Sequence, residues 1–368
     1  MFSGRRIRQA RELRGLTQVE LAERIGVTQA AIAYFERDLK QPSLEIVAQI
    51  ASQTKFPIAF FSASPPAMEF PTEALLFRSH ASLTKREIAS ASRNAEIALE
   101  IFDALSADLT EIPITLPRCS REPERAAHQV RAAFKLSPDT PIPNLIYLVE
   151  RLGVLVLSLP ETSPRLDAFS LWVGPNKTQP LIVLSGNRPS DRLRLSIAHD
   201  LGHLTMLHPS RYRAEEEREA WKFAAELLLP EKAMRREVIS PVTLSSIAVL
   251  KPRWGVSIAA LIRRAHELNI VSERQYRYLF EQLSAKGWRK AEPSNLDVAE
   301  ERPRALRQMA EMNYGDPIKY EQLAADMKLN SEFVKKLLNC YSGRAIFRET
   351  DNKQPSGRKI IPFKKFSS

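Results

Sequence analysis

The apolar positions of the first sixty residues recur with the period of short amphipathic helices. Over residues 5–14 the apolar side chains share one face, and after a glycine break a second helix covers Thr17–Ile25. Gly26 then turns the chain, and Thr28 has the side chain and the position of an N-cap for a third helix. Two short helices joined by a tight glycine-containing turn form a helix-turn-helix. We therefore predict an all-α helix-turn-helix domain over residues 1–61.

The third helix of this domain divides its side chains between an inward and an outward face. Ile32 and Phe35 point inward, whereas Gln29, Ala30 and Tyr34 point outward. Glutamine is suited to a bidentate contact with adenine, and alanine offers only an apolar contact, for instance to a thymine methyl group. The outward face is therefore the candidate nucleic-acid contact of the domain.

The stretch RELRGLTQVELAERIGVTQAAIAYFERDLKQPSLEIV closely resembles the phage-repressor-like XRE family. The resemblance implies that the third helix enters the major groove of a double-stranded DNA operator, and that the protein binds as a homodimer. The residues nearest base edges or phosphates would be Thr28, Gln29, Ala30 and Tyr34, with Gln18 at the DNA backbone. A module of this shape that binds a protein instead of DNA is the alternative.

Composition and charge agree with a globular DNA-binding protein. The chain has 368 residues, 44% of them hydrophobic, and 25 prolines against 12 glycines, which is typical of two or three domains with proline-punctuated connections. No apolar run approaches the length of a membrane span and the N-terminus lacks a signal-peptide core, so we expect a cytoplasmic protein. The formal net charge of +11 predicts attraction to polyanions. Arg11 is not counted among the DNA contacts, because it is placed to pair with Glu36 inside the domain.

Helical segments after residue 72 surround three short apolar runs of strand character. The runs are Val154–Leu159, Asp167–Gly174 and Gln179–Gly186, and short strands beside helices predict a small sheet in an α+β domain. A further strand-like segment is expected at Leu75–Arg78. The fold class is therefore mainly α. The expected divisions are the helix-turn-helix domain, a linker at 62–72, a second domain at 73–292, a helical region at 293–343 and a basic tail at 344–368.

The stretch SIAHDLGHLTML lies in a strongly apolar helix that begins near Ser190. His199 and His203 are four residues apart and share one face of that helix. This HxxxH spacing is the one by which a helix supplies two zinc ligands. Taken alone, the spacing favours two core histidines bonded to carbonyl groups.

The next helix, Glu215–Pro230, offers candidate third ligands. The stripe that contains Glu217 is otherwise small and apolar, whereas the stripe that contains Glu219 is largely solvent-like. Glu217 is thus the acid whose own face must be buried. Two histidines and one glutamate leave a fourth position for water, which is typical of catalytic zinc. His208 points away from the shared face of a continuous helix, and we expect it at the surface.

These segments resemble the ImmA/IrrE family of zinc metallopeptidases, whose members carry AHExxH, ExxA and FAxxLLMP. This chain has AHDLGH, EREA and FAAELLLP, and the likeness runs from about Arg121 to Pro293. The resemblance implies that the domain at 73–292 is a zincin-like metallopeptidase domain. It also implies zinc on His199, His203 and Glu217, with Asp200, the residue after the first histidine, as the general base.

Asp200 departs from the glutamate of the family motif. Its side chain is one methylene shorter, and general-base catalysis needs a reach of about 2.6–3.2 Å to the proton, directly or through one water. A slow peptidase, a peptidase with a shifted helix, and a zinc-binding domain that senses or scaffolds without cleaving all fit this departure.

Three functions follow from the combination of the two resemblances. The first is a DNA-binding transcription regulator whose zinc domain cuts, or once cut, a regulatory protein. The second is an antitoxin that represses its own operon and neutralises a co-encoded toxin without proteolysis. The third is a regulator that senses a metabolite.

Overall fold

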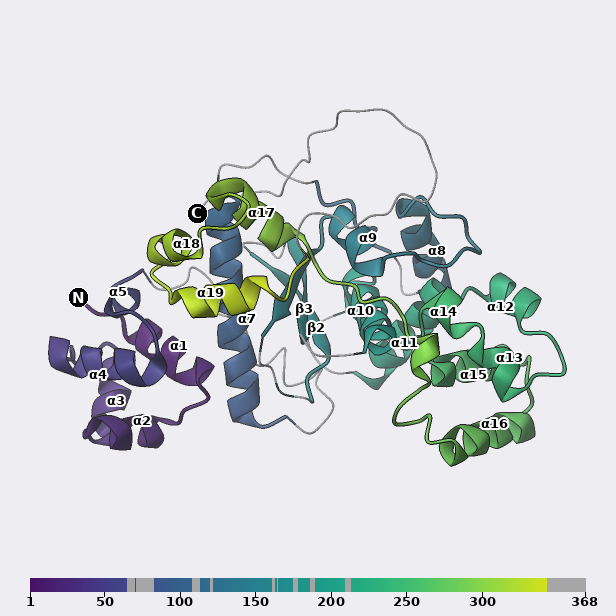
Figure 1. Cartoon of the computed structure of the whole chain (residues 1–368), viewed down its shortest axis with the longest axis horizontal. Helices are drawn as coiled ribbons and strands as arrows, with labels where there is room; N and C mark the ends of the chain where they lie inside the picture. The colour runs from purple at the N-terminus through teal and green to yellow at the C-terminus, as the bar shows by residue number, and fades with distance from the viewer. Residues whose placement is uncertain are drawn as a thin grey trace.

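The computed structural model describes residues 1–64, 70, 83–107, 113–119, 122–160, 163, 165–174, 178–185, 189–208 and 213–342. Most of the expected linker at 62–72 lies outside the described residues, as do the expected segment Leu75–Arg78 and the tail at 344–368. The described part is mainly α with one small sheet, which confirms the fold class predicted from the hydrophobic pattern (Figure 1).

Five short helices form the N-terminal domain: α1 (Gly4–Leu13), α2 (Gln18–Ile25), α3 (Gln29–Glu36), α4 (Leu44–Thr54) and α5 (Ile58–Phe61). Thr17 caps α2 in a reciprocal capping box with Glu20, and Thr28 caps α3 by accepting a hydrogen bond from the backbone N–H of Ala31. Gly26 ends α2 in the left-handed region, with φ at 69°, where glycine carries no steric cost. The expected caps and turn therefore define the helix-turn-helix.

The sheet has three strands: β1 (Leu155–Leu159), β2 (Ala168–Val173) and β3 (Gln179–Ser185). Their order is β1-β3-β2, with β1 parallel and β2 antiparallel to β3. Each strand lies within one of the three predicted runs. The antiparallel strand β2 is at an edge of the sheet, next to the helix that carries the paired histidines.

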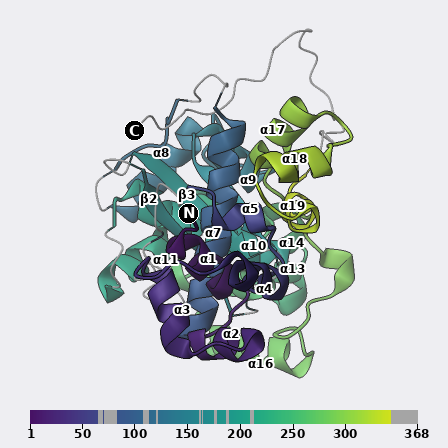
Figure 2. The same cartoon turned by 90° about the vertical axis from the view of Figure 1, so that its left-hand side faces the viewer.

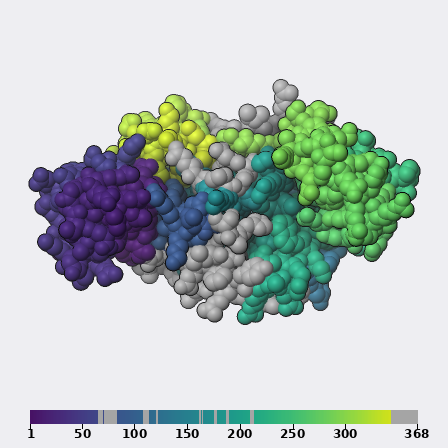
Figure 3. All heavy atoms as spheres, turned by 90° about the horizontal axis from the view of Figure 1, so that it is seen from below, coloured from purple at the N-terminus to yellow at the C-terminus, as the bar shows by residue number. Residues whose placement is uncertain are grey.

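The remaining helices lie on either side of this sheet and beyond it. Around the sheet are α7 (Lys85–Leu105), α8 (Pro123–Ala133), α9 (Leu145–Arg151), α10 (Ser190–Thr205) and α11 (Ala214–Leu228). Farther along are α12 (Glu231–Glu237), α13 (Leu244–Ala248), α14 (Lys251–Trp254), α15 (Ile258–Glu267), α16 (Glu273–Ala285), the 3₁₀ turn η2 (Ser294–Leu296), α17 (Ala305–Tyr314), α18 (Tyr320–Asp326) and α19 (Ser331–Leu338). Seen from below, the N-terminal domain occupies one end of the molecule and α12–α16 the other (Figure 3). None of the described helices combines the length and the apolar character that crossing a bilayer requires.

Alternating side chains of the sheet divide between two hydrophobic cores. Leu155 and Leu157 of β1 belong to a core shared with the N-terminal domain, α7 and α17–α19. Val156 and Ile182 point to the opposite face and belong to a core shared with α8–α16. Because strand side chains alternate between faces, this one small sheet joins both halves of the molecule.

The N-terminal domain is held against α7 by buried polar contacts as well as by the shared core (Figure 2). Arg6 forms an ion pair with Glu100 at 2.7 Å, and the Gln9 amide donates to Glu96 at 3.1 Å. Burial raises the pKa of Glu96, although Arg93 beside it acts in the opposite direction. The result is a docked domain whose helix α1 contacts α7 of the body.

Candidate metal centre and nucleic-acid interface

Helix α10 presents the two histidines from a largely buried position. It starts after Pro189 and packs on β2, β3 and α11. His199 and His203 lie one turn apart, with ring centroids separated by 4.7 Å. His203 is 3% exposed at its side chain and His199 is 13% exposed, so His199 is the one nearer to solvent.

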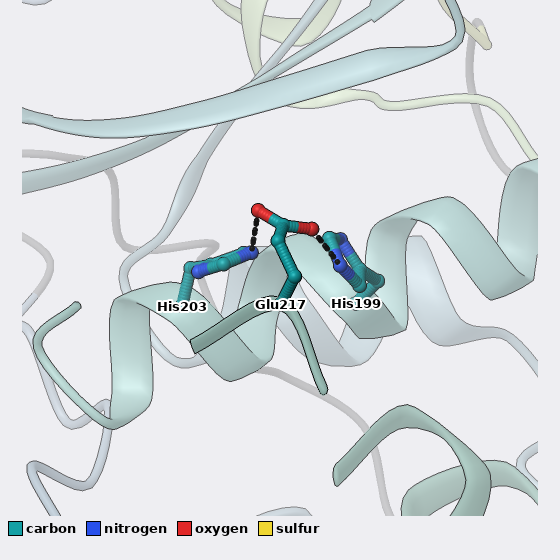
Figure 4. Close-up of side chains that lie close together, drawn as sticks. All are labelled: His199, His203 and Glu217. Atoms are coloured by element: carbon teal, nitrogen blue, oxygen red, sulfur yellow. Dashed lines mark hydrogen bonds and ion pairs between the residues drawn. The ribbon is translucent and has the colours of Figure 1, made fainter. Parts of the chain in front are cut away.

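Helix α11 brings Glu217 between the two imidazoles from its first turn (Figure 4). Glu217 Oε2 lies 3.1 Å from His199 Nε2, and Glu217 Oε1 lies 3.3 Å from His203 Nε2. One ligand atom from each residue falls within 4.8 Å of the other two, and this is the set of metal-binding type found in the described residues. Two atoms bound at about 2.0–2.1 Å to a tetrahedral ion lie roughly 3.3 Å apart. The three side chains therefore fit a zinc ion.

Close packing of α10 on α11 sets this geometry. Gly202 lies between the histidines, and a Cβ built on it would come within 2.8 Å of Phe223 Cδ1. Phe223 is fully buried on α11, so it has little room to move. Glycine at position 202 thus lets the helix that carries Glu217 approach the helix that carries the histidines.

The electrostatics of the centre favour a charged Glu217. Burial acts to raise its pKa, but the hydrogen bonds and the charges of His199 and His203 outweigh burial and hold the pKa below its usual range. A carboxylate that stays ionised, together with two imidazoles, is the donor set of a zinc site.

Asp200 lies on the side of α10 that faces the sheet. Its side chain is buried, and Oδ1 accepts a hydrogen bond of 3.0 Å from Ser170 Oγ on β2. The carboxylate predicted to be the general base is thus hydrogen-bonded to a neighbouring strand, one residue after His199.

Sequence reasoning misplaced His208 and Glu219. His208 was expected at the surface, but it is 5% exposed and contacts His203. The expectation was wrong because α10 ends at Thr205, and Leu207 adopts a left-handed conformation with φ at 54° that turns the chain back. Glu219 was assigned to a solvent-like stripe, but its carboxylate lies 3.0 Å from His208 Nε2. The sequence signal is a third histidine directly after a helix end, which helical periodicity alone does not detect.

The predicted DNA contacts lie together on the outward side of α2 and α3. Thr28, Gln29, Ala30 and Tyr34 are exposed, and Gln18 is half-buried at the start of α2. The Gln29 amide donates to Gln18 Oε1 at 2.9 Å, and the Gln18 amide donates to Glu36 Oε2 at 2.7 Å. The predicted pairing of Arg11 with Glu36 is confirmed. A chain of hydrogen bonds from the domain interior thus orients Gln29.

Comparison with known proteins identifies two parts of the chain. Residues 7–61 match the family model of the helix-turn-helix, and residues 149–266 match that of the IrrE N-terminal-like domain. These two matches confirm both resemblances drawn from the sequence.

The chain was also compared with individual proteins. No curated protein matches the chain. Among solved structures, the crystal structure of Bacillus thuringiensis PlcR in complex with the peptide PapR7 and DNA aligns at 14% identity. The alignment covers 79% of this chain and 98% of that chain, but its TM-score of 0.16 is too low to carry an argument.

Proposed function

We propose that this chain is a transcription regulator whose second domain binds zinc. It joins a DNA-binding helix-turn-helix domain to an IrrE N-terminal-like domain. The observation that carries the metal part is the Glu217 carboxylate, which reaches the Nε2 atoms of both His199 and His203. When bound, a zinc ion with three protein ligands polarises a water or a carbonyl group at its fourth position. The chain's own residues hold the ion at the junction of α10 and α11.

The observation that supports DNA reading is the orientation of Gln29. Its amide is tied to Gln18, which is tied in turn to Glu36, so the side chain loses little freedom when it contacts a base. Tyr34, five residues farther along α3, is 51% exposed. As a homodimer, the protein would read a palindromic operator with half-sites about one helical turn apart.

Replacing Gln29 with alanine should weaken operator binding by about 5–150-fold, because a good bidentate contact with a base is worth about 1–3 kcal/mol. The operator is first selected from random duplexes with the full-length protein, and affinities are then measured by fluorescence anisotropy at one fixed salt concentration. Gln53→Ala is the matched control, since Gln53 is an exposed glutamine on α4 away from this face. Unchanged affinity in Gln29→Ala and Tyr34→Ala would contradict DNA reading by α3.

Cleavage of a regulatory protein is a second candidate function, and the buried carboxylate of Asp200 beside His199 favours it. Its hydrogen bond to Ser170 and its short side chain both act against a fast reaction. A displacement of about 1 Å in a catalytic group costs on the order of a hundredfold in rate. We therefore propose slow cleavage that a longer side chain would accelerate.

Asp200→Glu should raise the cleavage rate of a co-encoded partner protein about a hundredfold, and Asp200→Ala should abolish cleavage. Both rates are followed by gel electrophoresis of the zinc-loaded protein mixed with the partner. If neither substitution changes the rate, Asp200 is not the base. If no variant cleaves but the partner is bound, the non-enzymatic antitoxin function replaces the peptidase.

A further inference from the structure

A buried histidine and a carboxylate extend the metal centre on the side away from Glu217. His208 Nδ1 lies 3.0 Å from His203 Nδ1, and His208 Nε2 lies 3.0 Å from Glu219 Oε2. The His208 side chain is fully buried and that of Glu219 is 18% exposed. The three side chains therefore form a line from the edge of the protein to the buried metal-binding histidine.

The backbone reverses at the end of α10 and so places His208 beside His203. The backbone N–H of His208 donates to the carbonyl of His203 at 3.0 Å, which is the closing hydrogen bond of a helix C-terminus with a left-handed residue. That left-handed residue is Leu207, which is not a glycine and is 48% exposed. A leucine in this conformation costs free energy, and the turn that it makes brings His208 into contact with His203.

The donors and acceptors along the line permit one proton arrangement in the metal-loaded state. A carboxylate only accepts, so a neutral His208 carries its single proton on Nε2 toward Glu219 and accepts at Nδ1. His203 Nδ1 must then donate to it. This leaves His203 Nε2, the nitrogen that faces Glu217, with the lone pair that a metal ion requires.

The opposite arrangement fails. If His208 donated from Nδ1, His203 Nδ1 would have to accept, and His203 Nε2 would then carry the proton and could not bind a metal. In a neutral His208 this arrangement would also leave Nε2 and the Glu219 carboxylate facing each other as two acceptors, and a zinc ion on His203 Nε2 excludes it in the loaded state.

We propose that His208 and Glu219 are positioning residues that fix the tautomer and the ring orientation of His203 for zinc binding. The inference rests on the zinc centre of the proposed function and adds two residues that are not ligands. His199, whose ring packs on Trp221 with centroids 4.3 Å apart, has a different environment, so the pair acts on one ligand.

The test is the zinc affinity of the full-length protein, measured by competition with a fluorescent chelator. His208→Ala should weaken zinc binding about 10–100-fold, the range found when outer partners of metal-binding histidines are removed. Glu219→Gln should produce a smaller loss in the same direction. Cobalt absorption spectra should also shift in His208→Ala, because the orientation of a ligand ring changes.

Two matched controls separate positioning from general effects. Glu215→Gln removes an exposed carboxylate one turn before Glu219 on α11, and His266→Ala removes a half-exposed histidine paired with Glu273. Both should keep the parent affinity. If His208→Ala unfolds, Glu219→Gln decides the question, since that side chain is partly exposed. Parent-like affinity in the folded variants overturns the inference alone, whereas a parent protein that binds no zinc overturns the proposed metal site as well.

Discussion

The Glu217→Ala variant is expected to lose stoichiometric zinc. The carboxylate is the ligand that joins α11 to the histidines of α10, at 3.1 Å from His199 and 3.3 Å from His203. Without it the site retains two imidazoles, which is one ligand fewer than a catalytic zinc site uses. The zinc content of the dialysed protein, measured by inductively coupled plasma mass spectrometry, should fall from about one zinc per chain to the background level.

The companion variants make that result specific. His199→Ala should lose zinc in the same way, because it removes one of the same three ligands. Glu215→Gln removes an acid two residues before Glu217 whose side chain is exposed, and it should retain zinc. Zinc that persists in His199→Ala would show that the metal binds elsewhere.

Replacing Arg11 with alanine should lower the free energy of unfolding by about 3–5 kcal/mol, which is the cost of leaving one partner of a buried ion pair alone. Arg11 and Glu36 are 7% and 8% exposed, and Arg11 Nη2 donates to Glu36 Oε2 at 3.0 Å. Arg11 Nη1 also donates to the Leu16 carbonyl at 2.6 Å. Urea unfolding followed by circular dichroism measures the change.

A double variant separates the stability of this pair from its effect on DNA reading. Arg11→Met combined with Glu36→Leu should recover most of the lost stability, because buried ion pairs are often replaced by apolar residues at little cost. It should not recover DNA affinity, since Glu36 also accepts the hydrogen bond that holds Gln18 against Gln29. Recovery of both properties would show that the hydrogen-bond chain does not orient Gln29.

The parts of the fold that follow local rules were predictable from the sequence. Thr17, Thr28 and Gly26 occupy the cap and turn positions of the helix-turn-helix, and each acts over only a few residues. The three strands follow from short apolar runs. The buried pairing of Arg11 with Glu36 could be predicted because helical spacing places the two side chains on facing sides of α1 and α3.

Glu217 was predicted as the third candidate ligand from the relative burial of helix stripes, and only some residues of those stripes have the expected burial. Ala220 and Ala224 on the stripe of Glu217 are fully buried, but Trp221 is 41% exposed. Glu226, on the stripe considered solvent-like, is buried beside Arg264 and His128. A charged residue is expected to be exposed, but it can be buried when it has a buried partner. Here the partners are distant in the sequence, so helical periodicity does not indicate them.

Long-range contacts account for what the sequence did not show. His208 depends on a backbone reversal at Leu207, which periodicity does not encode. The polar residues of α1 that face α7 resemble a solvated surface in the sequence, yet Arg6 and Gln9 are buried there. The burial of Arg6 and Gln9 depends on hydrogen bonds to Glu100 and Glu96, which lie about ninety residues away in the sequence.

The docking of α1 on α7 also bears on how a pair of copies would measure DNA. A DNA-binding domain on a flexible linker can bind half-sites at many separations, because the linker accommodates the difference in distance. Here the domain shares a hydrophobic core with one face of the sheet, and Phe56 contacts Phe333 of α19 as well. If two copies meet through this body, the surface of contact would set the separation of their helix-turn-helix domains and therefore the separation of half-sites that both domains can reach.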